Sequence, residues 1–104
     1  GQVPSFALVQ VVGCLTQGAD GWILARSTDA VRTSDPSASN AAELEALEAE
    51  PLGPRTFVLM SVYPDPAAHA AHKMEAKGFL IRDPDGDRIN VSTLGMVAPV
   101  CHQE

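Results

Sequence analysis

Residues 73–93 read KMEAKGFLIRDPDGDRINVST. In the first part, charged Lys73, Glu75 and Lys77 alternate with small or apolar residues, and a second polar–apolar alternation follows the turn-rich segment 83–87. Alternation with a period of two is typical of β-strands, and Asp and Gly between two such runs favour a tight turn. The stretch therefore predicts a β-hairpin, and with it a small β-barrel or sandwich. It contains no catalytic or cofactor-binding signature.

Upstream of this hairpin, apolar runs and turn signals predict three more strands and two helical segments. Residues 6–16 form a nearly unbroken apolar run, with apolar residues on both faces of the expected strand. This strand is therefore either buried on both faces or changes sheet halfway, with a bend at Gly13. Asn40, with Glu43 three residues on, can cap a helix that Pro51 stops. The expected elements are strand 6–16, turn 18–21, strand 22–27, loop 28–40, helix 40–50, strand 56–63 and helical turn 67–72.

Three meander strands, a helical link and a hairpin resemble the oligonucleotide/oligosaccharide-binding (OB) fold. The first strand bent at Gly13, and Gly78 within the fourth strand, fit that fold. The resemblance implies a mainly β protein: a five-stranded OB-like barrel with one short helix inserted between the second and third strands and a short helical turn before the last hairpin. Residues 1–104 then form one OB-like domain, with an N-terminal extension (1–5) and a C-terminal tail (98–104).

The chain is also similar to small exported bacterial proteins of uncharacterised function. The shared pattern reads GCL at 13–15, WIL at 22–24, HKM at 72–74 and APVC at 98–101. This similarity implies a fold and an export route. The sequence starts at Gly1 rather than at Met, which we interpret as the result of removing a secretory signal, the alternative being a trimmed expression product. We therefore expect a secreted or periplasmic protein.

The charge balance restricts the partners. The chain has 13 acidic and 7 basic residues, which give a net charge of −6. Nucleic acid and anionic membranes require a basic face, so we expect neither as a partner. OB-fold proteins that bind nucleic acid carry basic and aromatic residues on the barrel face, whereas this chain has one Trp, one Tyr and three Phe. No apolar run approaches the roughly 20 residues that span a bilayer, so no membrane insertion is expected.

Cys14 and Cys101 are the only cysteines. An even number of cysteines in a chain with an expected export route favours a disulfide. This bond would close a loop of about 88 residues and contribute on the order of 4 kcal/mol in the chain-entropy model. Two buried free thiols are the main alternative, and a metal-bound or reactive thiol is the other.

His69 and His72 are three residues apart. On a helical turn this spacing places both imidazoles on one side, as a zinc or copper site requires. His102 or an acidic side chain would have to supply a third ligand. Surface histidines on an Ala-rich turn are the simpler interpretation.

The sequence shows no nucleophile elbow, no phosphate-binding glycine loop and no histidine spaced as a base, so we expect neither an enzyme nor a cofactor. The expected function is a non-enzymatic structural or interaction subunit outside the cytoplasm, accessory to a larger complex or self-assembling. Apolar density from residue 3 to residue 15 supports it, because a single barrel strand needs fewer such residues and another chain can cover some of them.

This hypothesis makes a protein partner, or a second copy in a homo-oligomer, the expected binding partner. The N-terminal segment can pair with the edge of a neighbouring sheet, and we expect Val3, Phe6 and Leu8 to be the interface residues. The alternative function is a metal- or small-ligand-binding module that uses His69 and His72.

Overall fold

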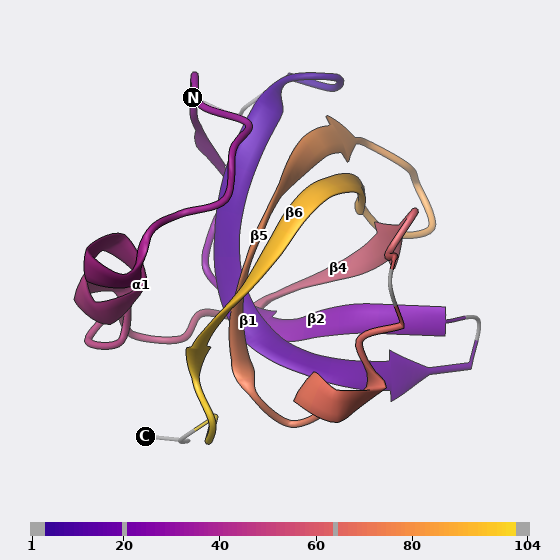
Figure 1. The fold of residues 1–104 in the computed structure, drawn as a ribbon. Coiled ribbons are helices and arrows are strands. Elements are labelled where there is room, and N and C mark those ends of the chain that lie inside the picture. Colours follow the sequence, from indigo (N-terminus) through magenta and orange to yellow (C-terminus); the bar gives the residue numbers. More distant parts are fainter. Residues whose placement is uncertain (1–3, 20, 64, 102–104) are drawn as a thin grey trace.

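The computed structural model of this chain describes residues 4–19, 21–63 and 65–101. Its elements follow one another along the chain in the order shown by the colours of Figure 1. They are β1 (Leu8–Gly18), β2 (Gly21–Ser27), β3 (Val31–Arg32), α1 (Ala41–Leu47), β4 (Arg55–Met60), the 3₁₀ turn η1 (Ala67–His69), β5 (Lys73–Ile81) and β6 (Arg88–Ala98).

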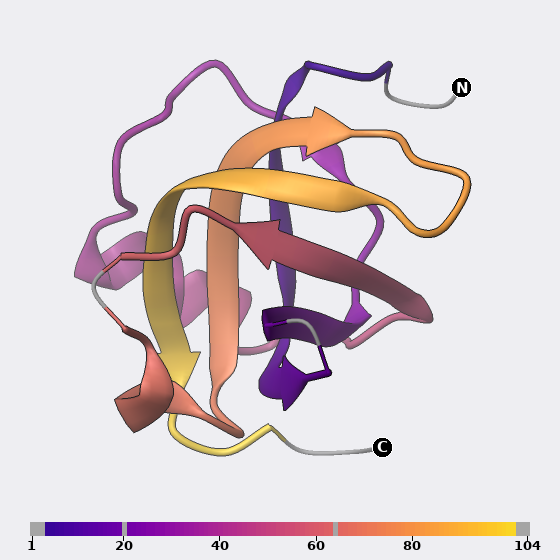
Figure 2. The same cartoon turned by 90° about the vertical axis from the view of Figure 1, so that its right-hand side faces the viewer.

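Five strands close into a ring in the order β1, β2, β4, β6, β5 and back to β1 (Figures 1 and 2). Neighbours in the ring are antiparallel except β4 and β6, which are parallel. Among the described strands, the short β3 pairs only with β1. This is the mainly β, five-stranded OB-like barrel that the sequence predicts, with α1 inserted between the second and third strands of the ring and η1 before the last hairpin.

β1 changes its partner halfway along. Its residues 8–14 pair with β5, and its residues 14–18 pair with β2. Gly13 stands at this change, where an added Cβ would lie only 2.8 Å from the carbonyl oxygen of Ala25. The close approach of the two backbones therefore requires glycine. The partner thus changes beside Gly13, where the sequence predicts a bend, and residues 11–15 are buried on both faces, as one of the two predicted alternatives requires.

The core of the barrel consists of side chains that alternate along the ring strands. Since successive side chains of a strand point to opposite faces, every second residue of a strand points into the interior. The largest contributions come from Val9, Val11, Leu15, Leu24, Phe57, Leu59, Met74, Leu80 and Ile89. Trp22 is partly buried and packs against this cluster.

Several element boundaries differ from the prediction. The sequence predicts a plain loop at 28–40, but Val31–Arg32 forms β3 because its backbone pairs with β1. Both side chains of β3 are exposed, so no apolar alternation indicates the strand. The helix ends at Leu47 rather than at residue 50, β4 ends at Met60 rather than at 63, and η1 covers 67–69 rather than 67–72.

The last strand is longer than its alternating sequence predicts. β6 continues to Ala98, because residues 94–98 remain paired with residues 73–76 of β5, with a register shift between Lys73 and Met74. The C-terminal tail therefore begins at Pro99 rather than at residue 98.

Residues 28–54, which connect β2 to β4, form a segment that we call the strap. The strap contains β3 and α1 and runs along the outside of the barrel (Figure 1). Asn40 caps α1 as predicted: its side chain accepts a hydrogen bond from the Glu43 N–H at 2.8 Å, and the Glu43 carboxylate accepts one from the Asn40 N–H at 2.9 Å. α1 packs on β6, where Leu44 lies beside Gly95.

Candidate functional site: a cationic pocket under the strap

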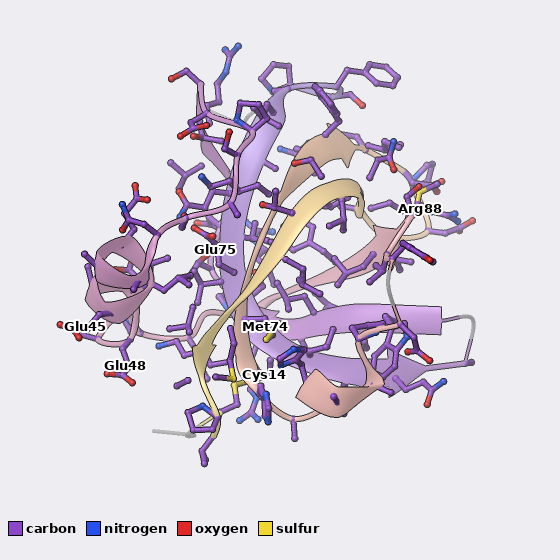
Figure 3. The ribbon with its side chains drawn as sticks, viewed as in Figure 1. Cys14, Glu45, Glu48, Met74, Glu75 and Arg88 are labelled. Carbon is purple, nitrogen blue, oxygen red and sulfur yellow. A yellow bond between two sulfur atoms is a disulfide. The ribbon has the colours of Figure 1, made fainter. Side chains whose placement is uncertain are left out.

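The strap covers three charged side chains on the outer face of β5, Lys73, Glu75 and Lys77, which are 7%, 1% and 4% exposed. The Lys77 ammonium donates a hydrogen bond to the Ser37 carbonyl at 2.8 Å. The Glu75 carboxylate accepts hydrogen bonds from Ser39 Oγ at 2.9 Å and from the side-chain amide of Gln10. Figure 3 shows Glu75 on the side of the barrel that carries the strap. Because a buried charge without hydrogen bonds is costly, these contacts hold the strap in one position on the barrel.

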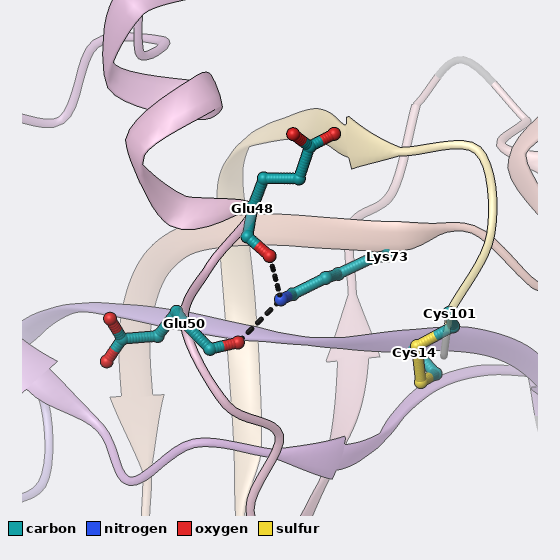
Figure 4. The surroundings of a disulfide bond; sticks show 5 residues. All are labelled: Cys14, Glu48, Glu50, Lys73 and Cys101. Carbon is teal, nitrogen blue, oxygen red and sulfur yellow. Dashed lines mark hydrogen bonds between the residues drawn. A yellow bond between two sulfur atoms is a disulfide. The ribbon is translucent and has the colours of Figure 1, made fainter. Parts of the chain in front are cut away.

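Lys73 holds the end of α1. Its ammonium donates hydrogen bonds to the carbonyl oxygens of Glu48 at 3.0 Å and Glu50 at 2.6 Å. The carboxylates of both glutamates point away from the ammonium (Figure 4). Within the described part of the chain, Lys73 forms no ion pair. The Lys73 charge is therefore buried with backbone partners and no counter-charge.

A pocket of about 720 Å³ lies beside Lys73. Its walls are Arg26 of β2, residues 48–53 of the strap, Lys73 and residues 98–100. Arg26 stands at a register shift between β2 and β4, with a φ of 50°, and its carbonyl accepts a hydrogen bond from the Gly53 N–H at 3.1 Å. The strap is thus fixed to the backbone that presents the Arg26 side chain.

Arg26 is the second cation of this pocket. Its Nη1 atom is buried and has no hydrogen-bond partner among the described residues, and within the same residues its side chain forms no ion pair. The sequence indicates neither cation as a site residue, because Arg26 belongs to no motif and Lys73 reads as one position of an alternating strand. The register places Ala25, next to Arg26, and Lys73 on either side of Cys14, and the strap supplies the remaining wall of the pocket.

Cys14 and Cys101 form a disulfide, with Cα atoms 5.8 Å apart, as the sequence predicts. Cys14 is opposite Lys73 in the β1–β5 register, and Lys73 is opposite Ala98 in the β5–β6 register. The bond therefore fastens the chain just beyond Ala98 to the barrel (Figure 4). It lies next to Lys73 and Ala98, which line the pocket. It fixes the wall that residues 98–100 provide.

The imidazole rings of His69 and His72, the predicted metal ligands, are in contact in an edge-on arrangement. Their Nδ1 atoms are 3.2 Å apart, and the rings are inclined at 69°. No group of three His, Cys, Asp or Glu side chains that could hold a metal occurs among the residues that the structure describes. The third ligand considered, His102, lies outside the described residues.

The expected interface residues lie at one end of β1. Val3 is outside the described residues, Phe6 is 74% exposed and Leu8 is half-buried. Leu8 is opposite Phe79 of β5, which is 46% exposed. Phe6 has a φ of 71°, in the left-handed region that aromatic residues rarely adopt.

The backbone of this N-terminal segment pairs inside the chain. The Phe6 N–H donates to the Leu80 carbonyl, and the Leu80 N–H donates to the Ala7 carbonyl at 2.9 Å. Apolar side chains of β1, such as Val9 and Val11, are buried in the chain's own core. The strap and the barrel thus account for most of the apolar density between residues 3 and 15, without a second chain.

Two exposed groups have displaced pKa values. The pKa of Asp35 is lowered, mainly by the hydrogen bond from the Ser37 backbone N–H to its carboxylate at 2.9 Å. The pKa of Arg55 is raised by its hydrogen bond and ion pair with Asp29 at 2.6 Å. Neither group lines the pocket, and both shifts come from surface contacts.

Comparison with known protein families, with curated proteins and with solved structures gives no match for this chain. Among the described residues, no helix has the length and apolar character needed to cross a membrane.

Proposed function

We propose that this protein is a non-enzymatic structural or interaction subunit that acts outside the cytoplasm and associates with a second copy of itself. The observation that carries the proposal is the apolar end of the β1–β5 pair, formed by Phe6, Leu8 and Phe79. Phe6 is held with its ring largely in water by a backbone conformation that costs free energy. Strained residues of this kind cluster at functional sites such as ligand clamps.

The edge beside the apolar end favours a second copy as the partner. β3 pairs with β1 on one side, and no described strand pairs with its other side. Val31 of β3 is 59% exposed. Two identical edges related by a two-fold axis are automatically complementary, whereas a different protein would have to supply a matching edge. The Cys14–Cys101 disulfide supports an oxidising, extracytoplasmic location.

Sedimentation equilibrium over a range of concentrations tests the proposal. We expect the unmodified chain to dimerise, and Phe6→Asp combined with Phe79→Asp to weaken dimerisation at least about tenfold, since charges at a buried contact are costly. Tyr63→Asp is the matched control, because Tyr63 is 92% exposed and lies outside the apolar end. A monodisperse monomer at the highest concentration, or equal effects of both changes, would contradict self-association.

A metal-binding module is the second candidate function. The 3.2 Å separation of the two Nδ1 atoms suits a shared proton, but it also suits two nitrogens on one ion, since zinc–nitrogen bonds are about 2.0–2.1 Å long. Titration with Zn²⁺ or Cu²⁺, followed by calorimetry, distinguishes the two. The candidate predicts binding that His69→Ala and His72→Ala each abolish; absence of saturable binding by the unmodified chain excludes it.

A further inference from the structure

We propose that the pocket under the strap binds a small monoanion, a carboxylate that carries an apolar chain. Two cationic residues, Arg26 and Lys73, line its wall, and within the described residues neither has a carboxylate partner. Proteins normally pair a buried charge with an opposite charge, because desolvation penalises an isolated ion. A bound anion supplies the missing counter-charge.

The available hydrogen-bond donors of Lys73 and Arg26 favour a carboxylate. The Lys73 ammonium has three N–H donors and uses two of them on the Glu48 and Glu50 carbonyls, so one remains. The guanidinium of Arg26 has a buried Nη1 that finds no acceptor among the residues that the structure describes. A planar carboxylate accepts hydrogen bonds from a guanidinium and an ammonium at the same time.

The remaining walls restrict the size and charge of the ligand. Apolar Pro51, Leu52, Ala98, Pro99 and Val100 line the pocket, and about 720 Å³ accommodates a small organic molecule. The acidic side chains of Glu48 and Glu50 lie on the strap and point away from Lys73. With two nearby carboxylates and a net charge of −6, a multiply charged anion is disfavoured relative to a monoanion.

Binding of hexanoate, acetate and 1-hexanol to the disulfide-bonded chain at pH 7 tests this proposal by backbone amide NMR. Hexanoate should shift the amide signals of Leu52, Gly53 and Val100 in a saturable way. Hexanol, which lacks the charge, and acetate, which lacks the apolar chain, should each bind at least about tenfold more weakly. Equal binding of hexanoate and hexanol, or hexanoate shifts confined to other residues, would overturn the proposal without any variant.

A charge-removing variant then assigns the anion contact. Arg26→Met should weaken hexanoate binding at least about tenfold, because the guanidinium contact is lost. Arg55→Met is the matched control: it removes the same charge from an exposed ion pair outside the pocket and should change binding less than about twofold. Equal losses in the two variants would show that only the overall charge matters. The Phe6→Asp, Phe79→Asp chain should keep hexanoate binding, so this test is independent of self-association.

Discussion

At the scale of single residues, Gly78 allows β5 and β6 to approach each other closely. A Cβ at this position would overlap the backbone carbonyl oxygen of Asn90. The β5–β6 register shifts between Lys77 and Gly78, so the backbone of β6 bulges toward β5 at this level. Neither backbone can move away without breaking ladder hydrogen bonds. The requirement for glycine therefore comes from space rather than from backbone dihedral angles.

We expect Gly78→Ala to lower the free energy of unfolding by about 3 kcal/mol, the upper part of the usual range for overpacking. Gly95→Ala is the control on the partner strand, because the three atoms nearest to its Cβ would all belong to side chains: the flexible end of Leu44, at 3.3 Å, and Oε1 of Glu75, at 3.9 Å. It should cost less than about 1 kcal/mol. Urea denaturation of the two variants measures both values, and similar losses would show that the space at Gly78 is not limiting.

At the scale of elements, β5 anchors the strap through hydrogen bonds. Its inner face supplies apolar core residues, and its outer face supplies the hydrogen bonds that Lys73, Glu75 and Lys77 make to the strap. α1 itself contains no buried residue, and a seven-residue helix is marginal in isolation. The helix thus depends on its capping box and on these anchors.

We expect Ser39→Ala to lower the free energy of unfolding by about 1–2 kcal/mol, since it removes a hydrogen bond to the buried Glu75 carboxylate. Amide hydrogen exchange in α1 should also become faster. Ser34→Ala is the control in the same loop, because Ser34 is exposed, and it should change stability by less than about 0.5 kcal/mol. If the amide protons of α1 exchange at the same rate in both variants, Glu75 does not hold the strap in place.

At the scale of the whole molecule, one covalent bond joins the beginning of the barrel to its end. The disulfide connects β1 to the tail across a sequence separation of 87 residues. It restricts the unfolded chain more than the folded one, because the barrel already places the two cysteines side by side. The bond also holds residues 99–101 beside the cationic pocket.

Removing both cysteines, by Cys14→Ala with Cys101→Ala, should lower the free energy of unfolding by about 4 kcal/mol. Adding reductant should have a similar effect on the unmodified chain and no effect on the double variant. Denaturation with and without reductant measures both effects. Equal stability of the oxidised chain and the double variant would mean that the unfolded state is not restricted by the bond.

The sequence by itself determined the barrel. Three local signals predict its strands and the faces that they bury: the alternation in residues 73–93, the continuous apolar run of β1 and Gly13 within that run. The capping pair Asn40 and Glu43 likewise defines the start of α1 within the chain. The two cysteines favoured a disulfide because their number and the expected export route were visible without any fold.

Only the tertiary structure decided where the strap lies, and therefore where the pocket is. β3 forms from two exposed residues through backbone pairing with β1, and backbone hydrogen bonds leave no trace in side-chain patterns. Lys73 and Arg26 come from different strands and belong to no shared motif. Their proximity depends on long-range packing. The strap crosses the outer face of the barrel and buries charged side chains there, whereas the local alternation predicts that these side chains are exposed.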